Sequence, residues 1–168
     1  MTKIAIINGP AGVGKDTFVN FIKDNYLIGT IINVSTIDCV KTAARALGWD
    51  GVKDDKGRKF LSELKYFANQ YYPISINTVR EALSENPRAA CIFVHCREPK
   101  EIDKIKEEFD AITILVRNDY LGDIPNNLPN NYSDQNVFNY DYDYIINNTG
   151  TLQDLEKTAK KFITEVLI

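Results

Sequence analysis

Apolar residues in this chain form short runs that alternate with amphipathic segments of helix length. The runs of strand length cover residues 3–8, 31–34, 91–95, 112–116 and 144–146. They lack a clean apolar–polar alternation, which is typical of strands covered on both faces in a parallel sheet. Helical patterns cover residues 15–26, 38–47, 56–71, 76–85, 99–109 and 151–167. This order predicts an α/β three-layer sandwich with a doubly wound, five-stranded parallel sheet and a ligand at the carboxyl ends of its strands.

A glycine-rich segment follows the first predicted strand, and its sequence is Gly9-Pro10-Ala11-Gly12-Val13-Gly14-Lys15-Asp16-Thr17. It fits the first seven positions of the phosphate-binding pattern G-x-x-x-x-G-K-[ST], between the strand and the helix that this motif requires. Glycines let successive backbone N–H groups wrap phosphate oxygens, and the following helix adds its positive dipole end. We therefore expect Gly9 and residues 11–17 to bind ATP, with Lys15 at its β- and γ-phosphates.

The eighth position of the pattern departs from it, because Asp16 stands where Ser or Thr is usual and Thr17 follows. An anion beside a triphosphate is repelled unless a cation lies between them, and carboxylates are natural Mg²⁺ ligands. Asp16 is therefore a candidate metal ligand and catalytic residue. Two alternatives stay open: Asp16 serves only the helix dipole, or Thr17 binds the metal, directly or through water.

Further candidates follow the later strands. Arg97 and Arg117 come directly after the third and fourth strands, where an arginine can bind phosphate in a bidentate manner or stabilise transferring charge. With Lys15 and Asp16 they form the predicted catalytic set, and a surface position is the alternative for each arginine. The candidates for binding the acceptor are Ser35, Asp38, Lys41, Arg45 and Arg58. Surface positions, or for Asp38 a helix N-terminus, are their alternatives.

Residues 118–141 are rich in Asn, Asp, Tyr and Pro and show no apolar period. A long loop inside a compact domain is usually functional or disordered. We expect a lid-like insertion that covers the site, and a plain surface excursion is the alternative. A group of aromatic residues between positions 49 and 72 either stacks on a base or packs in the core. They are Trp49, Phe60, Tyr66, Phe67, Tyr71 and Tyr72.

Composition narrows the class of protein. The 168 residues fit one domain, with 44% hydrophobic and 26% charged residues. A net charge of −3 argues against a nucleic-acid-binding surface. The three scattered cysteines suit a reducing compartment, and neither a signal peptide nor a membrane span is evident. A cytoplasmic protein that acts on a small molecule is therefore expected.

The loop ending Gly14-Lys15-Asp16-Thr17 and several later segments resemble one known family. The later segments are Ser35-Thr36-Ile37-Asp38-Cys39-Val40-Lys41 with the following Gly48-Trp49, Lys56-Gly57-Arg58-Lys59-Phe60-Leu61, His95-Cys96-Arg97-Glu98-Pro99, and residues 142–152. Together they are similar to P-loop kinases of small metabolites, and most of all to the phage and bacterial deoxynucleoside monophosphate kinases. The last segment is also similar to the closing strand and final helix of dephospho-coenzyme A kinases.

This resemblance implies a single kinase-like domain over residues 1–168, ATP and Mg²⁺ as cofactors, and Asn148, Thr149 and Gly150 beside the adenine. The chain departs from the family at His95, where an acidic residue commonly helps to organise Mg²⁺ or the acceptor. His95 is either a ligand-side donor or base, or a plain strand-end residue. A second departure is the predicted cover, because no Lys or Arg lies between Arg117 and Lys157.

The sequence therefore predicts an ATP-dependent kinase that transfers the γ-phosphoryl group to a small acceptor, with a (deoxy)nucleoside monophosphate as the first choice. One alternative is a dephospho-coenzyme A, gluconate or other metabolite kinase on the same scaffold. The other is an ATP-binding protein without catalysis, which His95 and the cation-poor cover favour. The sequence leaves the acceptor's base and the oligomeric state open, a homodimer included.

Overall fold

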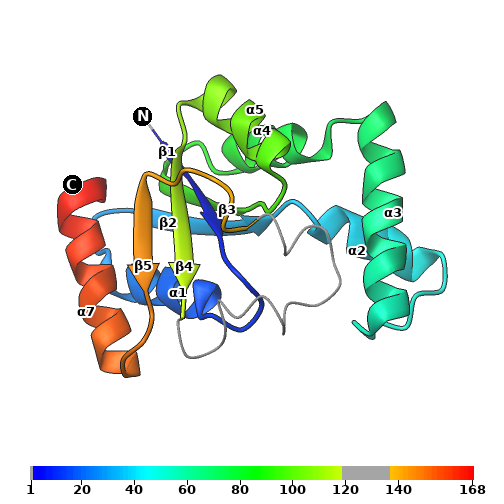
Figure 1. Ribbon diagram of the computed structural model, residues 1–168. Coiled ribbons are helices and arrows are strands. Elements are labelled where there is room, and N and C mark those ends of the chain that lie inside the picture. Colours follow the sequence, from blue (N-terminus) through cyan, green and yellow to red (C-terminus); the bar gives the residue numbers. More distant parts are fainter. Residues whose placement is uncertain (1, 119–136) are drawn as a thin grey trace.

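The computed structural model describes residues 2–118 and 137–168, and its centre is a β-sheet (Figure 1). The strands are β1 (Lys3–Asn8), β2 (Thr30–Ser35), β3 (Ala89–His95), β4 (Ile112–Arg117) and β5 (Tyr144–Asn147). They lie in the order β2-β3-β1-β4-β5, and every neighbouring pair is parallel. The chain runs outward from β1 to β2, returns through β3 and then crosses to β4. The predicted doubly wound, five-stranded parallel sheet is thereby confirmed.

Helices connect these strands at the predicted places, with ends that differ from the prediction by at most two residues before the last helix. They are α1 (Lys15–Asn25), α2 (Asp38–Ala46), α3 (Asp55–Tyr71), α4 (Ile74–Glu85), α5 (Pro99–Phe109) and α7 (Leu152–Phe162). After α7 the chain forms a π-helical turn over Ile163–Leu167, and Ile168 N donates to Ile163 O at 3.1 Å. Apolar spacing predicts one continuous helix over 151–167 because it does not distinguish these two hydrogen-bond steps.

Each face of the sheet is covered by its own pair of helices. Successive residues of a strand face opposite sides, so Ile7 packs in one cluster with Phe18 of α1, whereas Ile6 packs in another with Ile102 of α5. Helix α7 completes the first cluster and α4 the second. Because both faces are buried, the central strands read as continuous apolar runs in the sequence.

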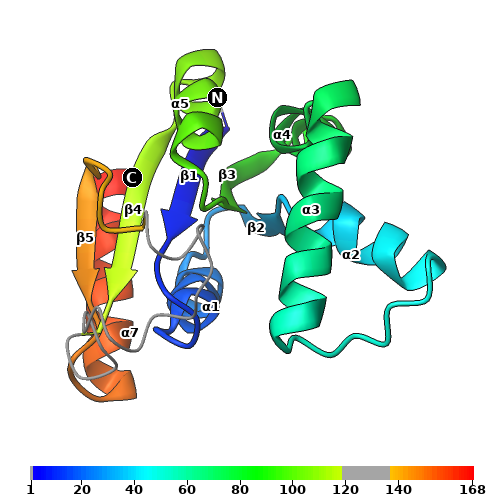
Figure 2. The same ribbon diagram turned by 45° about the vertical axis from the view of Figure 1, so that its right-hand side comes forward.

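Helices α2 and α3 lie beyond the β2 edge of the sheet, away from α7 (Figure 2). They share a third, smaller cluster of buried side chains around Val40, Ala44, Leu61 and Ile74. Helix α3 begins after an N-cap, because the Asp54 side chain accepts a hydrogen bond from Gly57 N at 2.7 Å. The α2–α3 pair therefore forms one wall of the space beside the sheet edge.

The insertion predicted at about 118–141 lies mostly outside the described residues, so it stays a prediction, as does the single-domain boundary. Within the described part of the chain, no helix combines the length and the apolar character that crossing a membrane would require.

Candidate active site

The loop after β1 requires glycine at two positions. Gly9 has a φ of 145°, and a Cβ there would lie 2.2 Å from the backbone oxygen of Val116 in β4. Gly14 has a φ of 93°, and a Cβ there would lie 2.6 Å from Nδ2 of Asn148. Side chains are excluded at both positions by backbone conformation and by space. The loop therefore closes tightly against β4 and Asn148, and α1 begins directly after it.

Lys15 is the first residue of α1 and folds back onto the loop. Its Nζ donates to the carbonyl oxygens of Gly9 at 2.7 Å and Pro10 at 2.6 Å. These bonds hold the ammonium group at the loop, where the positive end of the α1 dipole also lies. A polyphosphate bound there would meet a full positive charge together with the N-terminus of a helix.

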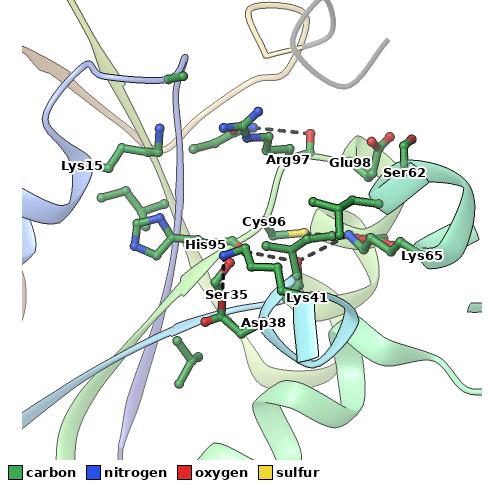
Figure 3. A pocket seen from close by; sticks show the side chains of 18 of the residues that line it. Lys15, Ser35, Asp38, Lys41, Ser62, Lys65, His95, Cys96, Arg97 and Glu98 are labelled. Carbon is green, nitrogen blue, oxygen red and sulfur yellow. Dashed lines mark hydrogen bonds and ion pairs between the residues drawn. The ribbon is translucent and has the colours of Figure 1, made fainter. Parts of the chain in front are cut away.

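A cleft of about 770 Å³ opens at this loop. It begins at Gly12, Lys15 and Asp16, crosses the carboxyl ends of β2 and β3, and ends at α3. Figure 3 shows Lys15 on one side of the cleft and Lys65 on the other. A volume of this size suits a small-molecule ligand, and its location is the one expected for a doubly wound sheet.

The cleft brings together a large part of the predicted site. The predicted residues that line it are Ala11, Gly12, Lys15, Asp16, Ser35, Asp38, Lys41, Arg58 and Arg97. Lys41 lies beside Asp38, with Nζ 2.7 Å from Oδ1, so much of its charge is already compensated. Lys53 and Lys100 also line the cleft, although the sequence analysis did not single them out.

Asp16 is linked to β2 and β3 through neutral side chains. Asn33 Nδ2 donates to Asp16 Oδ1 at 3.3 Å, and Nε2 of His95 lies 2.9 Å from Asn33 Oδ1. Because that amide oxygen can only accept, His95 carries its hydrogen on Nε2. His95 therefore holds Asn33, and Asn33 holds the carboxylate, which is 79% exposed toward the cleft.

His95 itself stays uncharged at neutral pH. Burial lowers the pKa of its imidazole, and Lys15 and Arg97 act in the same direction, whereas Asp16 and Asp38 oppose the shift. Nε2 lies 3.4 Å from Asp16 Oδ1. Where the resembling family has a carboxylate, this chain thus places a neutral imidazole beside Asp16.

These residues fit a divalent cation only together with a nucleotide. Within the described residues, no group of three or more His, Cys, Asp or Glu side chains could hold a metal ion. Asp16 offers one exposed carboxylate beside the phosphate-binding loop, and Mg²⁺ is commonly bound by one or two carboxylates plus substrate phosphates. Thr17 does not line the cleft.

A polar stripe on α3 forms the far wall of the cleft. Arg58, Ser62, Lys65 and Asn69 all line it and recur at intervals of four, three and four residues. This spacing places them on one face of the helix. The sequence analysis named only Arg58, although the spacing was available as a signal.

Other predicted residues lie away from this cleft. Arg45 lies over the Trp49 ring, 5.5 Å from its centroid, and is absent from the cleft lining. Arg117 donates from Nε to Asn147 Oδ1 at 2.6 Å, at the ends of β4 and β5. The Asn148 side chain donates to Val13 O at 2.9 Å, so it borders the loop from the β5 side. The adenine contacts expected of Asn148, Thr149 and Gly150 stay predictions.

Most of the aromatic candidates for base stacking lie outside the cleft. Only Tyr66 lines the cleft, while Trp49 and Phe60 pack against the α2–α3 cluster. Phe67 and Tyr71 are exposed, the latter at 95%. The cleft is therefore lined mainly by polar and charged side chains.

Asn8, at the end of β1, connects the loop to a distant segment. It is 1% exposed, and its Oδ1 accepts from Gly9 N at 2.8 Å. Its Nδ2 donates to the Tyr142 hydroxyl at 2.7 Å, and that hydroxyl donates to Val137 O at 2.8 Å. The start of the phosphate-binding loop is thus fixed to the described residues that precede β5.

No family model and no curated protein matches the sequence. Among solved structures, an unliganded sugar kinase from a Janibacter species matches with a TM-score of 0.57 at 11% identity, over 99% of this chain and 96% of the other. Shikimate kinase from Aquifex aeolicus matches with a TM-score of 0.54 at 10% identity, over 96% of both chains. The chain has the fold of these kinases. At this identity the likeness concerns the fold alone, so the resemblance to deoxynucleoside monophosphate kinases stays a prediction.

Proposed function

We propose that this protein transfers the γ-phosphoryl group of ATP to a small acceptor bound in the cleft between the sheet edge and α3. The observation that carries this proposal is the continuity of the cleft, which joins the glycine-rich loop and Lys15 to the polar face of α3. Phosphoryl transfer requires mainly positioning and charge neutralisation. This cleft supplies a phosphate-binding end and an acceptor end in one space.

At the donor end, the loop and Lys15 would hold the ATP phosphates, and Asp16 would hold Mg²⁺ together with them. The cation, when bound, neutralises charge on the transferring group. Asn33 and His95 keep the Asp16 carboxylate in place. Arg97 follows β3 and lines the cleft between its two ends, where a guanidinium can stabilise the oxygens of the transferring group.

At the acceptor end, cations that lack a carboxylate partner among the described residues favour a substrate that carries an anionic group. Lys53, Arg58 and Lys100 line the cleft, and none of them has a carboxylate of the described residues within ion-pair distance. A phosphate group on the acceptor would supply the missing negative charge. A (deoxy)nucleoside monophosphate, the acceptor that the sequence resemblance implies, is therefore the first candidate.

One observation favours a hydroxylated metabolite as the second candidate. The cleft has hydroxyl and amide groups at Ser35, Thr36, Ser62 and Asn69, whereas Tyr66 is the one phenyl-type side chain among the described residues that line it. Such a lining suits a polyhydroxylated acceptor, for example gluconate, as well as a nucleotide. Dephospho-coenzyme A belongs to the same alternative, and an ATP-binding protein without transfer is the third.

The test is an acceptor panel with ATP and Mg²⁺: dAMP, dCMP, dGMP, dTMP, gluconate and dephospho-coenzyme A. We expect one acceptor to become phosphorylated, and Lys15→Ala to lower its turnover at least about 100-fold, as for other lost transition-state donors. Lys23→Ala, an exposed lysine on the same helix, is the matched control and should retain wild-type turnover. Wild-type turnover in Lys15→Ala would refute the mechanism. ATP binding without transfer to any acceptor would leave the inactive alternative.

A further inference from the structure

A largely buried carboxylate outside the predicted site connects the acceptor end of the cleft to the body of the protein. Glu101, in the first turn of α5, has a side chain that is only 16% exposed. Its oxygens accept from Lys65 Nζ at 2.6 Å, Asn69 Nδ2 at 2.6 Å and Ser75 Oγ at 2.7 Å. One carboxylate on α5 therefore holds side chains from both α3 and α4.

The neighbours of Glu101 stabilise the charged form of its carboxylate. Burial by itself would raise the pKa of Glu101. The charge of Lys65 and the hydrogen bonds from Lys65, Ser75 and Asn69 outweigh burial, so the pKa lies below its usual value. Glu101 is thus an anion at neutral pH, and it compensates the charge of Lys65.

Lys65 lines the cleft, as do Asn69 and Glu101 of the same network, and it is the member that carries a positive charge. Its ammonium group donates to Glu101 Oε2 and, more weakly, to Thr36 Oγ1 at 3.4 Å. Thr36 Oγ1 in turn donates to the backbone oxygen of His95 at 3.2 Å, at the end of β3. An ammonium group has three hydrogens, and the described residues show two partners for it. The remaining hydrogen is available to a ligand in the cleft that Lys65 lines.

The cations at the acceptor end therefore differ in whether a carboxylate already compensates their charge. Lys53, Arg58 and Lys100 have no carboxylate partner among the described residues and suit an anionic group. Lys65 is 13% exposed and already paired at 2.6 Å, so a second anion would compete with Glu101. A neutral oxygen adds a hydrogen bond without disturbing that pair.

We infer that Lys65 donates a hydrogen bond to an uncharged hydroxyl or carbonyl oxygen of the acceptor, and that Glu101 is the positioning residue that fixes Lys65 for this contact. The inference rests on the proposed function and names the kind of acceptor atom that Lys65 of α3 contacts. In a nucleotide such an oxygen belongs to the sugar or the base, and in a polyhydroxylated acceptor to a hydroxyl group.

The first test is Lys65→Met, assayed with the panel acceptor of highest turnover. We expect the KM for the acceptor to rise at least about tenfold, as for a lost hydrogen bond to a charged group, while the KM for ATP stays within about twofold. Lys106→Met is the matched control, because Lys106 of α5 also forms an ion pair, with Nζ 2.9 Å from Asp143 Oδ1, but does not line the cleft. It should leave the acceptor KM unchanged.

A double variant separates positioning from stability. Lys65→Met leaves the largely buried Glu101 carboxylate without its cation, and Glu101→Gln leaves the Lys65 ammonium group without its anion, so each variant is expected to unfold at lower urea concentration. Lys65→Met/Glu101→Gln contains neither charge, and its urea midpoint should recover toward that of the wild type. Its acceptor KM should nevertheless stay as high as that of Lys65→Met, because the donor is still missing.

Two results would overturn the inference while leaving the proposed function intact. One is an acceptor KM in Lys65→Met that is within twofold of the wild type. The other is an acceptor KM that recovers together with stability in the double variant. Failure of the wild type to phosphorylate any acceptor would instead remove the proposed function, and this inference with it.

Discussion

Alanine at Gly14 places a methyl group against the Asn148 side chain, which borders the phosphate-binding loop. The added Cβ would lie 2.6 Å from Asn148 Nδ2, so the Asn148 side chain must move and give up its 2.9 Å hydrogen bond to Val13 O. Gly12→Ala is a matched control. Gly12 also has a positive φ, of 79°, but no heavy atom lies within 4 Å of its missing Cβ.

The two variants therefore share the destabilisation that comes from backbone conformation and differ in the one that comes from the lost hydrogen bond. A left-handed backbone costs a residue with a Cβ about 1–2 kcal/mol, and this applies to both positions. Loss of the Asn148 hydrogen bond adds about 0.5–1.5 kcal/mol at Gly14 alone. We expect Gly14→Ala to lower the free energy of unfolding by about 2–3 kcal/mol in total, which is about 1 kcal/mol more than Gly12→Ala.

Urea denaturation monitored by circular dichroism measures this difference. With a slope of about 2 kcal/mol/M, the midpoint of Gly14→Ala should lie about 0.5 M below that of Gly12→Ala. ATP titration should also show weaker binding in Gly14→Ala, because displacement of Asn148 opens the loop. Equal midpoints for the two variants would refute the packing argument for Gly14.

Two further predictions concern ionisable groups around the cleft. The pKa of Glu101 is depressed in the folded protein, so its contribution is complete above the ordinary glutamate value of about 4.5 and is lost as the pH falls through the lower folded value. Glu101→Gln should therefore lower the free energy of unfolding at pH 7 and reduce the loss of stability that the wild type shows below pH 4.5. Urea midpoints measured from pH 7 to pH 3 test this. If the midpoint of Glu101→Gln falls with pH as steeply as that of the wild type, Glu101 is not responsible. His95→Ala removes the partner of Asn33, which holds Asp16, and should raise the Mg²⁺ concentration for half-maximal activity about tenfold. A Mg²⁺ titration at fixed ATP that matched the wild type would exclude this role for His95.

The sequence predicted the parts of the fold that depend on local pattern. The buried strands, the helices between them and the loop from Gly9 to Thr17 all follow from periodicity and glycine spacing within short windows. The contacts between the elements of the site could not be predicted in the same way. Lys65 and Glu101 are 36 residues apart, and His95 and Asn33 are 62 apart, so their contacts depend on how α3 packs against α5 and β2 against β3.

Local sequence pattern does not distinguish basic residues that line the cleft from those that pack elsewhere. Arg45 and Arg58 are both basic residues on helices beyond the β2 edge, and the sequence does not distinguish them. The structure does, because Arg45 lies on the Trp49 ring whereas Arg58 lines the cleft. Asn33 offered a weak signal, since a polar residue interrupts an otherwise apolar strand, but its link to Asp16 needed the neighbouring His95.

The separate apolar cluster of α2 and α3 has a consequence for how this scaffold can diversify. Val40, Ala44, Leu61 and Ile74 form that cluster independently of the two clusters that support the sheet and the glycine-rich loop. Mutations on the α3 face can thus leave the two sheet clusters unchanged, except at Lys65 and Asn69, which bond to Glu101 of α5. Libraries that randomise the cleft-facing positions of α3 therefore offer a route to a changed acceptor preference while the ATP-binding loop stays the same.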